Sequence, residues 1–239
     1  MRDVQIIPIM NDEYLLFASD NSGGIGMKEL DEIKVPYKLL AYYSFRVAFM
    51  ECIAAGGDPV TVVVSNFCGE GVWDQLVEGI ELGLDEVGMK TIEITGSSES
   101  NMNMIQSALG VLVIGKSNKV QNNPLTYTKD LEIALIGSPL VGKEVIDQPK
   151  EIAPLSMANY FCTLEGFVVM PVGSKGILHE LKLLFPEEHL RNESLECAID
   201  LNKSSGPSTC FIIVYSSKEI EKVREFAGNL YTSIQYNKE

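Results

Sequence analysis

Residues 36–67 read PYKLLAYYSFRVAFMECIAAGGDPVTVVVSNF, and this stretch decides the class of fold. Apolar residues recur in its first part at a spacing of three and four, which predicts a helix over 36–55. The run GGDP at 56–59 is a strong helix stop. The β-branched run that follows predicts a buried strand over 60–67, so the stretch indicates a helix and a strand that pack together.

The sequence on both sides continues this alternation of strands and helices. Up to residue 118 it predicts strands at 4–9 and 14–18, a polar glycine loop at 19–26, a helix at 72–88, a strand at 91–95, a polar loop at 96–101 and a strand at 105–115. Beyond it we expect strands at 131–136, 167–171 and 210–215, a glycine loop at 172–177 that leads into a helix, and a C-terminal helix at 218–231.

The polar run at 118–123 and Pro124 predict a boundary between two domains, 1–118 and 124–239. The pattern predicts a two-lobed α/β (α+β) protein. In such folds the loops that follow strands carry the functional residues.

Composition excludes several functional classes. The 239 residues carry a formal charge of −14, which argues against a partner that is nucleic acid or an anionic membrane surface. The five cysteines include no CxxC pair, and no apolar run approaches the ~20 residues of a membrane span. Since the N-terminus does not resemble a signal peptide, we expect a protein of the reducing cytoplasm.

Two acidic residues flank the predicted N-terminal hairpin. Asp3 precedes its first strand and Asp20 follows its second, so a hairpin would bring both carboxylates to the same open end. Two close carboxylates repel unless a cation lies between them, and Mg²⁺ prefers such oxygen ligands. The alternative is that both are solvated loop acids.

Two further stretches contain possible ligands. Glu51 precedes small residues that would let a backbone or a phosphate approach closely; the alternative is a tightly packed helix end. The loop Gly96-Ser97-Ser98-Glu99 offers hydroxyls and a carboxylate directly after a strand, and suits Mg²⁺ or phosphate as well as a solvated turn.

Glycine-rich loops occur at Asn21–Gly24 and at Gly173–Gly176, and neither matches a Walker or a Rossmann pattern. Lys175, in the second loop, could pair with a phosphate as a point charge, or be a surface lysine in a turn.

In order and spacing these motifs resemble the aminoimidazole-ribonucleotide synthetase-like superfamily, whose ATP-using members include thiamine-monophosphate kinase, selenophosphate synthetase and α-ribazole kinase. Ser19-Asp20 matches its threonine–aspartate motif, residues 51–59 match its helix motif, Thr95–Glu99 matches its glycine–aspartate loop, and Gly173–Gly176 loosely matches a later acidic loop. The Thr95–Asn101 and Val172–Gly176 loops look most like those of α-ribazole kinase.

The resemblance implies an N-terminal mixed sheet that forms a barrel across a homodimer, and a C-terminal α/β sandwich. It implies an ATP- and Mg²⁺-dependent kinase for a nucleoside-like acceptor, with α-ribazole as the first choice. The alternative is a thiamine-monophosphate kinase-like enzyme or another phosphotransferase of the superfamily. Asp20 and Lys175 would be catalytic, and the implied metal ligands are Asp3, Asp20, Glu51 and Glu99. Nucleotide contacts would come from Asn21, Gly23, Gly24, Gly96, Ser97 and Ser98.

The sequence departs from the family pattern at four positions where an aspartate is usual. Arg2, Glu51, Ser97 and Lys175 stand at these positions. The departures leave open a protein of another class, one that has kept the fold and the nucleotide site but has lost catalysis.

Overall fold

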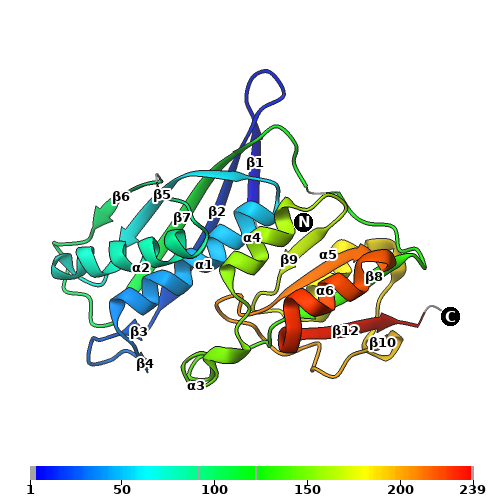
Figure 1. Cartoon of the computed structure of the whole chain (residues 1–239). Helices are drawn as coiled ribbons and strands as arrows, with labels where there is room; N and C mark the ends of the chain where they lie inside the picture. The colour runs from blue at the N-terminus through cyan, green and yellow to red at the C-terminus, as the bar shows by residue number, and fades with distance from the viewer. Residues whose placement is uncertain (1–3, 91, 122, 238–239) are drawn as a thin grey trace. The chain divides into compact units, whose positions relative to one another are not determined.

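The computed structural model describes residues 4–90, 92–121 and 123–237, and it is a mixed α/β structure (Figure 1). The chain divides between residues 121 and 122 into two compact units. This division falls between the two predicted ranges, and the roles assigned to those ranges stay predictions. No described helix is long and apolar enough to cross a membrane.

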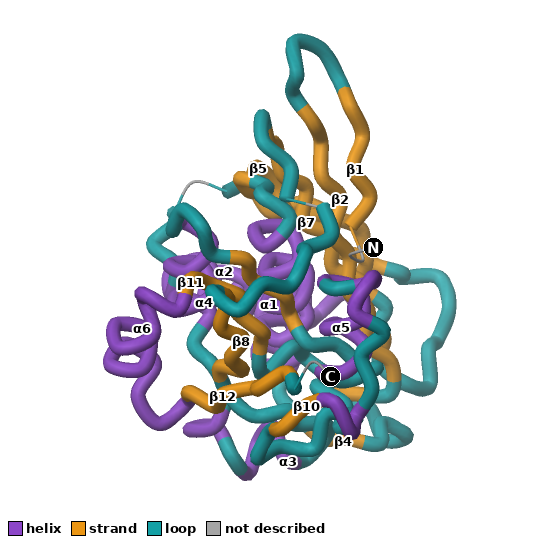
Figure 2. The backbone as a smooth tube through the Cα atoms, turned by 90° about the vertical axis from the view of Figure 1, so that its right-hand side faces the viewer, coloured by secondary structure: helices purple, strands orange, loops and turns teal. Residues whose placement is uncertain are grey.

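The N-terminal unit is one five-stranded sheet covered on one face by two helices. Its strands lie in the order β1-β2-β7-β5-β6, and β5 and β6 are its parallel pair. The elements are β1 Val4–Pro8, β2 Tyr14–Gly23, the short pair β3 Ile25–Gly26 and β4 Ile33–Lys34, α1 Tyr37–Ala54, β5 Asp58–Asn66, α2 Trp73–Glu86, β6 Glu93–Ser98 and β7 Ala108–Ser117. Figure 2 shows β1 and β2 as a long hairpin whose turn projects from the rest of the unit.

Helix α1 packs against β2, β5 and β7, and α2 packs against α1. The two helices approach closely at Gly79, where an added Cβ would collide with the carbonyl oxygen of Lys38 and lie 2.8 Å from the Cβ of Ala41. The glycine therefore permits the close approach of the two helices.

The C-terminal unit is an antiparallel sheet with helices on both faces. Its strands lie in the order β10-β12-β8-β11-β9. The elements are β8 Leu131–Ile136, α3 Glu144–Asp147, α4 Leu155–Thr163, β9 Val168–Pro171, α5 Ile177–Leu184, β10 Leu195–Glu196, β11 Phe211–Ser216, α6 Ile220–Ala227 and β12 Tyr231–Tyr236.

Alternation along β11 explains why both faces of this sheet are covered. Ile212 and Val214 belong to a core cluster that includes residues of α5, such as Leu181. On the other face the ring of Phe211 lies 6.2 Å from that of Phe161 on α4, in an edge-to-face arrangement. Such a strand, apolar on both faces, must lie between two layers.

Three sequence predictions about secondary structure are wrong. Residues 19–23 continue β2 and residues 96–98 continue β6, although both segments were expected to be loops. A run of polar side chains is typical of a loop, but polar residues also occur on an exposed strand face. The expected helix over 218–231 ends at Ala227, because Gly228 adopts a φ of 55°, and β12 follows it.

Candidate functional site

Predicted nucleotide-contacting residues of β2 and β6 lie in one row across the N-terminal sheet. The register pairs Asn21 with Gly110 of β7, Gly110 with Ser65 of β5, and Ser65 with Ser97 of β6. Asn21, Ser65 and Ser97 are exposed. The row spans three strand spacings, about 14 Å. Strand pairing therefore brings two segments that are 76 positions apart onto one polar surface on the face opposite the helices.

Asp20 points to the other face of the sheet, toward α1. Alternation along β2 puts Asp20 and Ser22 on the side of the buried residues Leu16 and Ala18. The hydroxyl oxygens of Ser22 and Ser44, the latter on α1, lie 2.9 Å apart, and Ser44 also hydrogen-bonds to the Asp20 carboxylate. One carboxylate and two hydroxyls thus form a half-buried oxygen cluster beneath the sheet.

Burial raises the pKa of Asp20 from 3.8 to about 6, and hydrogen bonds from Ser44 and from the backbone of Asn21 oppose part of that rise. Burial removes water from the ionised carboxylate, and a bound cation can compensate for that lost solvation. A buried carboxylate therefore gains more from a bound cation than a solvated one does. The donor atoms of the cluster are the oxygen type that Mg²⁺ prefers. The cluster fits the predicted role of Asp20 at a magnesium ion.

The segment after Glu51 is packed tightly. Added Cβ atoms at Gly57 and Gly115 would lie 2.8 Å and 2.5 Å from the sulfur of Cys52. The small residues thus let the end of α1 approach β7, as the packing alternative predicted. Glu51 itself is half-buried on α1, seven residues after Ser44, so both lie on one side of the helix. Its role as a metal ligand stays a prediction.

The end of β6 is held by hydrogen bonds. Glu99 accepts bonds through Oε1 from the backbone N–H groups of Asn101 and Met102, at 2.6 and 3.0 Å. Ser98 accepts one from the side chain of Asn66, at 2.8 Å. Gly96 has no room for a side chain, since an added Cβ would collide with the carbonyl oxygen of Val64. Glu99 and Ser98 therefore have structural roles in addition to their predicted roles at the metal and the nucleotide.

The loop between β3 and β4 contains a buried carboxylate that sequence reasoning missed. Asp31 is 5% exposed and accepts hydrogen bonds from the backbone N–H of Lys28 at 2.8 Å and from the N–H and hydroxyl of Ser107, both at 2.7 Å. Burial would raise the pKa of Asp31, but these bonds and the attraction of Lys34 lower it below its usual value. Asp31 therefore fastens the loop between β3 and β4 to the segment just before β7.

Other predicted residues fall elsewhere. Gly23 ends β2, and Gly24 follows it with a φ of 69°. Lys175 is exposed in a turn of the C-terminal unit, before Gly176, whose φ is 80°. Asp3 lies outside the described residues. Among the residues that are described, no three His, Cys, Asp or Glu side chains group together to hold a metal ion, and the predicted ligand set stays a prediction.

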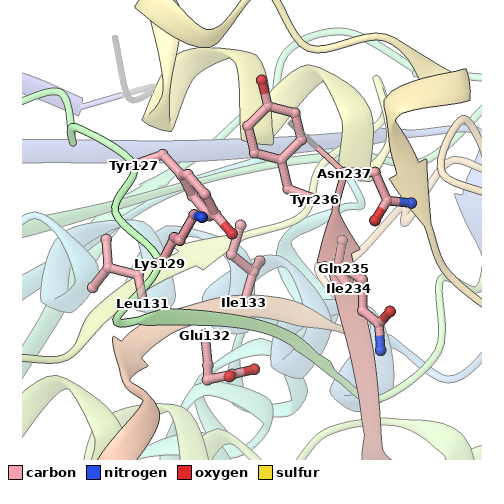
Figure 3. Close-up of a pocket in the computed structure, with 9 residues that line it drawn as sticks. All are labelled: Tyr127, Lys129, Leu131, Glu132, Ile133, Ile234, Gln235, Tyr236 and Asn237. Atoms are coloured by element: carbon pink, nitrogen blue, oxygen red, sulfur yellow. The ribbon is translucent and has the colours of Figure 1, made fainter. Parts of the chain in front are cut away.

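A pocket of about 250 Å³ lies in the C-terminal unit, where β8 and β12 separate (Figure 3). The ladder between these strands ends at Ile133 and Ile234. The rings of Tyr127 and Tyr236 meet edge-to-face above the gap, with centroids 4.9 Å apart. The pocket contains none of the predicted site residues.

Comparisons with solved structures identify the architecture. A structure of thiamine monophosphate kinase from Aquifex aeolicus has a TM-score of 0.65 at 12% identity, over 98% of this chain and 88% of that one. AaThiL complexed with AMPPCP and TMP has a TM-score of 0.60 at 12% identity, over 98% and 84%. T. maritima PurL complexed with ADP has a TM-score of 0.62 at 14% identity, over 99% of this chain but only 42% of PurL.

The chain has the aminoimidazole-ribonucleotide synthetase-like fold. No family model matches the sequence, and no curated protein sequence matches it. The similarity thus identifies the fold and no particular member, and it confirms the mixed α/β architecture expected from the motifs. The barrel shared across a dimer stays a prediction.

Ser44, Ser65 and Asn66 lie near the candidate site and were missed by the sequence analysis. Asn66 ends the strand predicted over 60–67, and a polar residue at the end of a buried strand is the same signal that pointed to Ser97. Ser44 lies inside a helix, where local sequence offers no signal.

Proposed function

We propose that the protein is an ATP- and Mg²⁺-dependent phosphotransferase that phosphorylates a small nucleoside-like molecule. The observation that carries the proposal is the polar row from Asn21 to Ser97, at the end of the sheet where Asp20 forms its oxygen cluster with Ser44. Support also comes from a fold whose solved examples were crystallised with ADP and AMPPCP.

Phosphoryl transfer depends on positioning and on neutralising charge more than on covalent chemistry. In the proposal Asn21, Gly23 and Gly24 bind the nucleotide from β2, and Gly96, Ser97 and Ser98 bind it from β6. Asp20 holds the metal together with Asp3, Glu51 and Glu99, and Lys175 attracts the transferred phosphate. Mg²⁺, when bound, would draw off the negative charge that develops between the β- and γ-phosphates.

We propose α-ribazole as the acceptor. The γ-phosphate of ATP would pass to the ribose 5′-hydroxyl, giving ADP and α-ribazole 5′-phosphate, while the hydroxyl proton goes to solvent. The motifs that resemble α-ribazole kinase support this choice. Thiamine monophosphate is the alternative acceptor, since it is bound in a structure of the same fold.

The test is an ADP-release assay with purified protein, ATP and Mg²⁺, run with each acceptor and with none. We expect ADP to form with α-ribazole in a 1:1 ratio with the phosphorylated product. ADP that forms only with thiamine monophosphate would transfer the proposal to that acceptor. No acceptor-dependent ADP with either compound would contradict both assignments.

One observation favours a second candidate, a nucleotide-binding protein without catalysis. The Glu99 carboxylate already accepts hydrogen bonds from two backbone N–H groups of its own turn. It therefore serves the turn at the position where it would replace a missing family aspartate. Calorimetry with AMPPCP, with and without Mg²⁺, tests this candidate: tight binding combined with no turnover would favour it.

We also propose a homodimer formed through the N-terminal sheet. β1 is an edge strand of the sheet. Ile7 in this strand is 42% exposed, and Ile9, just after its end, is 44% exposed. Exposed apolar edge strands are normally covered.

Light scattering should give twice the 26.3 kDa chain mass, and Ile7→Lys should shift the measured mass toward that of the monomer. The matched control is Leu82→Lys on α2, 47% exposed, which should leave the mass unchanged. A monomeric wild type at micromolar concentration would contradict the proposal.

A further inference from the structure

The side chain of Asn66 joins three segments at the end of β5. Only 1% of the residue is exposed. Its Oδ1 accepts a hydrogen bond from the backbone N–H of Cys68 at 2.8 Å. Its Nδ2 donates to the carbonyl oxygen of Gly69 at 2.9 Å and to the hydroxyl oxygen of Ser98 at 2.8 Å. Both ends of the amide are therefore engaged.

These partners determine which way the amide faces. A backbone N–H can only donate and a carbonyl oxygen can only accept, so Oδ1 must face Cys68 and Nδ2 must face Gly69. The reversed amide would place two donors together at Cys68 and two acceptors together at Gly69. The second hydrogen of Nδ2 consequently points at Ser98, whose oxygen must act as the acceptor.

The orientation leaves the Ser98 hydroxyl with its hydrogen to donate. Among the described residues none accepts that hydrogen, and the bond from Asn66 is the one hydrogen bond that the Ser98 side chain makes there. A hydroxyl whose oxygen already accepts a hydrogen bond is a better donor through its own hydrogen. The backbone N–H of Glu99 donates to the carbonyl oxygen of Asn66 at 2.8 Å, so the strand end is held on both sides.

We infer that Asn66 is a positioning residue that turns the Ser98 hydroxyl into a dedicated hydrogen-bond donor for an anionic oxygen. The inference rests on the proposed function, because it assigns that oxygen to a phosphate of the bound nucleotide. The Asn66 N–H occupies one of the two lone pairs of the Ser98 oxygen and directs the hydroxyl hydrogen away from Asn66. In this assignment Ser98 binds the nucleotide, and the carboxylates hold the metal.

The experiment is a double-mutant cycle of Ser98→Ala and Asn66→Asp, read by calorimetry with AMPPCP and Mg²⁺, with inorganic phosphate, and with adenosine. In Asn66→Asp the side chain still accepts the hydrogen bond from the backbone N–H of Cys68, but an oxygen replaces the N–H that faces Ser98. The Ser98 hydroxyl then donates its hydrogen to that oxygen and no longer to the ligand. Each single variant should weaken AMPPCP about 10-fold and leave adenosine unchanged, because a hydrogen bond to a charged group is lost. The double variant should bind no worse than either single variant.

The matched control is Thr61→Val. Thr61 also links β5 to β6 through its side chain, by a 3.0 Å bond from its hydroxyl to the carbonyl oxygen of Glu93, at the other end of the strand pair. It should bind AMPPCP like the wild type. If Asn66→Asp fails to fold, Asn66→Ala takes its place in the same cycle, and Ser98→Ala gives the expected loss by itself.

The outcomes separate the inference from the proposed function. A wild type that binds AMPPCP, with both single variants binding it equally well, overturns the inference and leaves the proposed function standing. Losses that add in the double variant also overturn it, since the two residues would then act independently. A wild type that binds neither AMPPCP nor phosphate overturns both.

Discussion

Asp20→Asn should lose about 100-fold or more of the Mg²⁺-dependent, acceptor-dependent ATP turnover, while the protein keeps its fold. Asparagine preserves the size of the side chain and one oxygen that accepts hydrogen bonds, but it removes the charge that would hold the metal. Asp20 is the one carboxylate of the oxygen cluster that it forms with Ser22 and Ser44, so the variant leaves that cluster without a charge. The measurement is the ADP-release assay over a Mg²⁺ titration.

The same variant should be more stable than the wild type in the absence of metal. The folded pKa of Asp20 is about 6 against an ordinary 3.8, so the stability that this group contributes is present below pH 3.8 and is lost as the pH rises through 6. At pH 8 the ionised, half-buried carboxylate costs about 3 kcal/mol, which Asp20→Asn recovers. Urea unfolding at pH 4 and pH 8 measures this difference, which should be small at pH 4.

The control is Asp85→Asn, which removes one negative charge from an exposed position on α2. It should change neither the turnover nor the difference in stability between the two pH values. Full activity in Asp20→Asn would remove the central residue of the proposed site. Equal stability of this variant and the wild type at pH 8 would show that burial of Asp20 is not costly.

Asp31→Ala should lower the free energy of unfolding by about 3 kcal/mol at pH 7. The change leaves the backbone N–H groups of Lys28 and Ser107 without their carboxylate acceptor in a buried place. Because folding lowers the pKa of Asp31, the stability that this carboxylate contributes is present above pH 3.8. That stability is lost as the pH falls toward the lower pKa of the folded state. The stability gap between variant and wild type should therefore narrow in acid.

Urea unfolding at pH 7 and at pH 3 measures both effects. The control is Glu32→Gln, which changes the exposed neighbour of Asp31 and should alter stability by less than about 0.5 kcal/mol. A loss of less than 1 kcal/mol in Asp31→Ala, on the order of one ordinary hydrogen bond, would mean that the loop between β3 and β4 does not depend on this carboxylate.

Much of the fold was predictable because its signals are local. The helix expected over 36–55 is found as Tyr37–Ala54, and the helix expected over 72–88 as Trp73–Glu86. Apolar spacing along one segment and a glycine or proline at its end are sufficient for this. β12 was missed because its residues Tyr231–Tyr236 are half polar, and only pairing with β8 and β10 makes them a strand.

The candidate site was predictable only as a set of polar segments. Residues 19–23 and 96–98 were recognised as unusual, but as loops rather than as strand ends. From a loop one cannot derive that Asn21 and Asp20 point to opposite faces of a sheet. The pairing of Ser65 with Gly110 and Ser97 depends on contacts between distant segments, so no local pattern encodes it.

The amino-acid sequence by itself determined the helices, the order of the polar motifs and the architecture that they resemble, since these depend on neighbours along the chain. Tertiary structure decided which residues meet: Asp20 with Ser44, Asp31 with Ser107, and Asn66 with Ser98. Each pair joins segments that lie 24 to 76 positions apart. Strand register and helix packing bring such residues together, and a one-residue slip of register would turn each strand side chain to the other face.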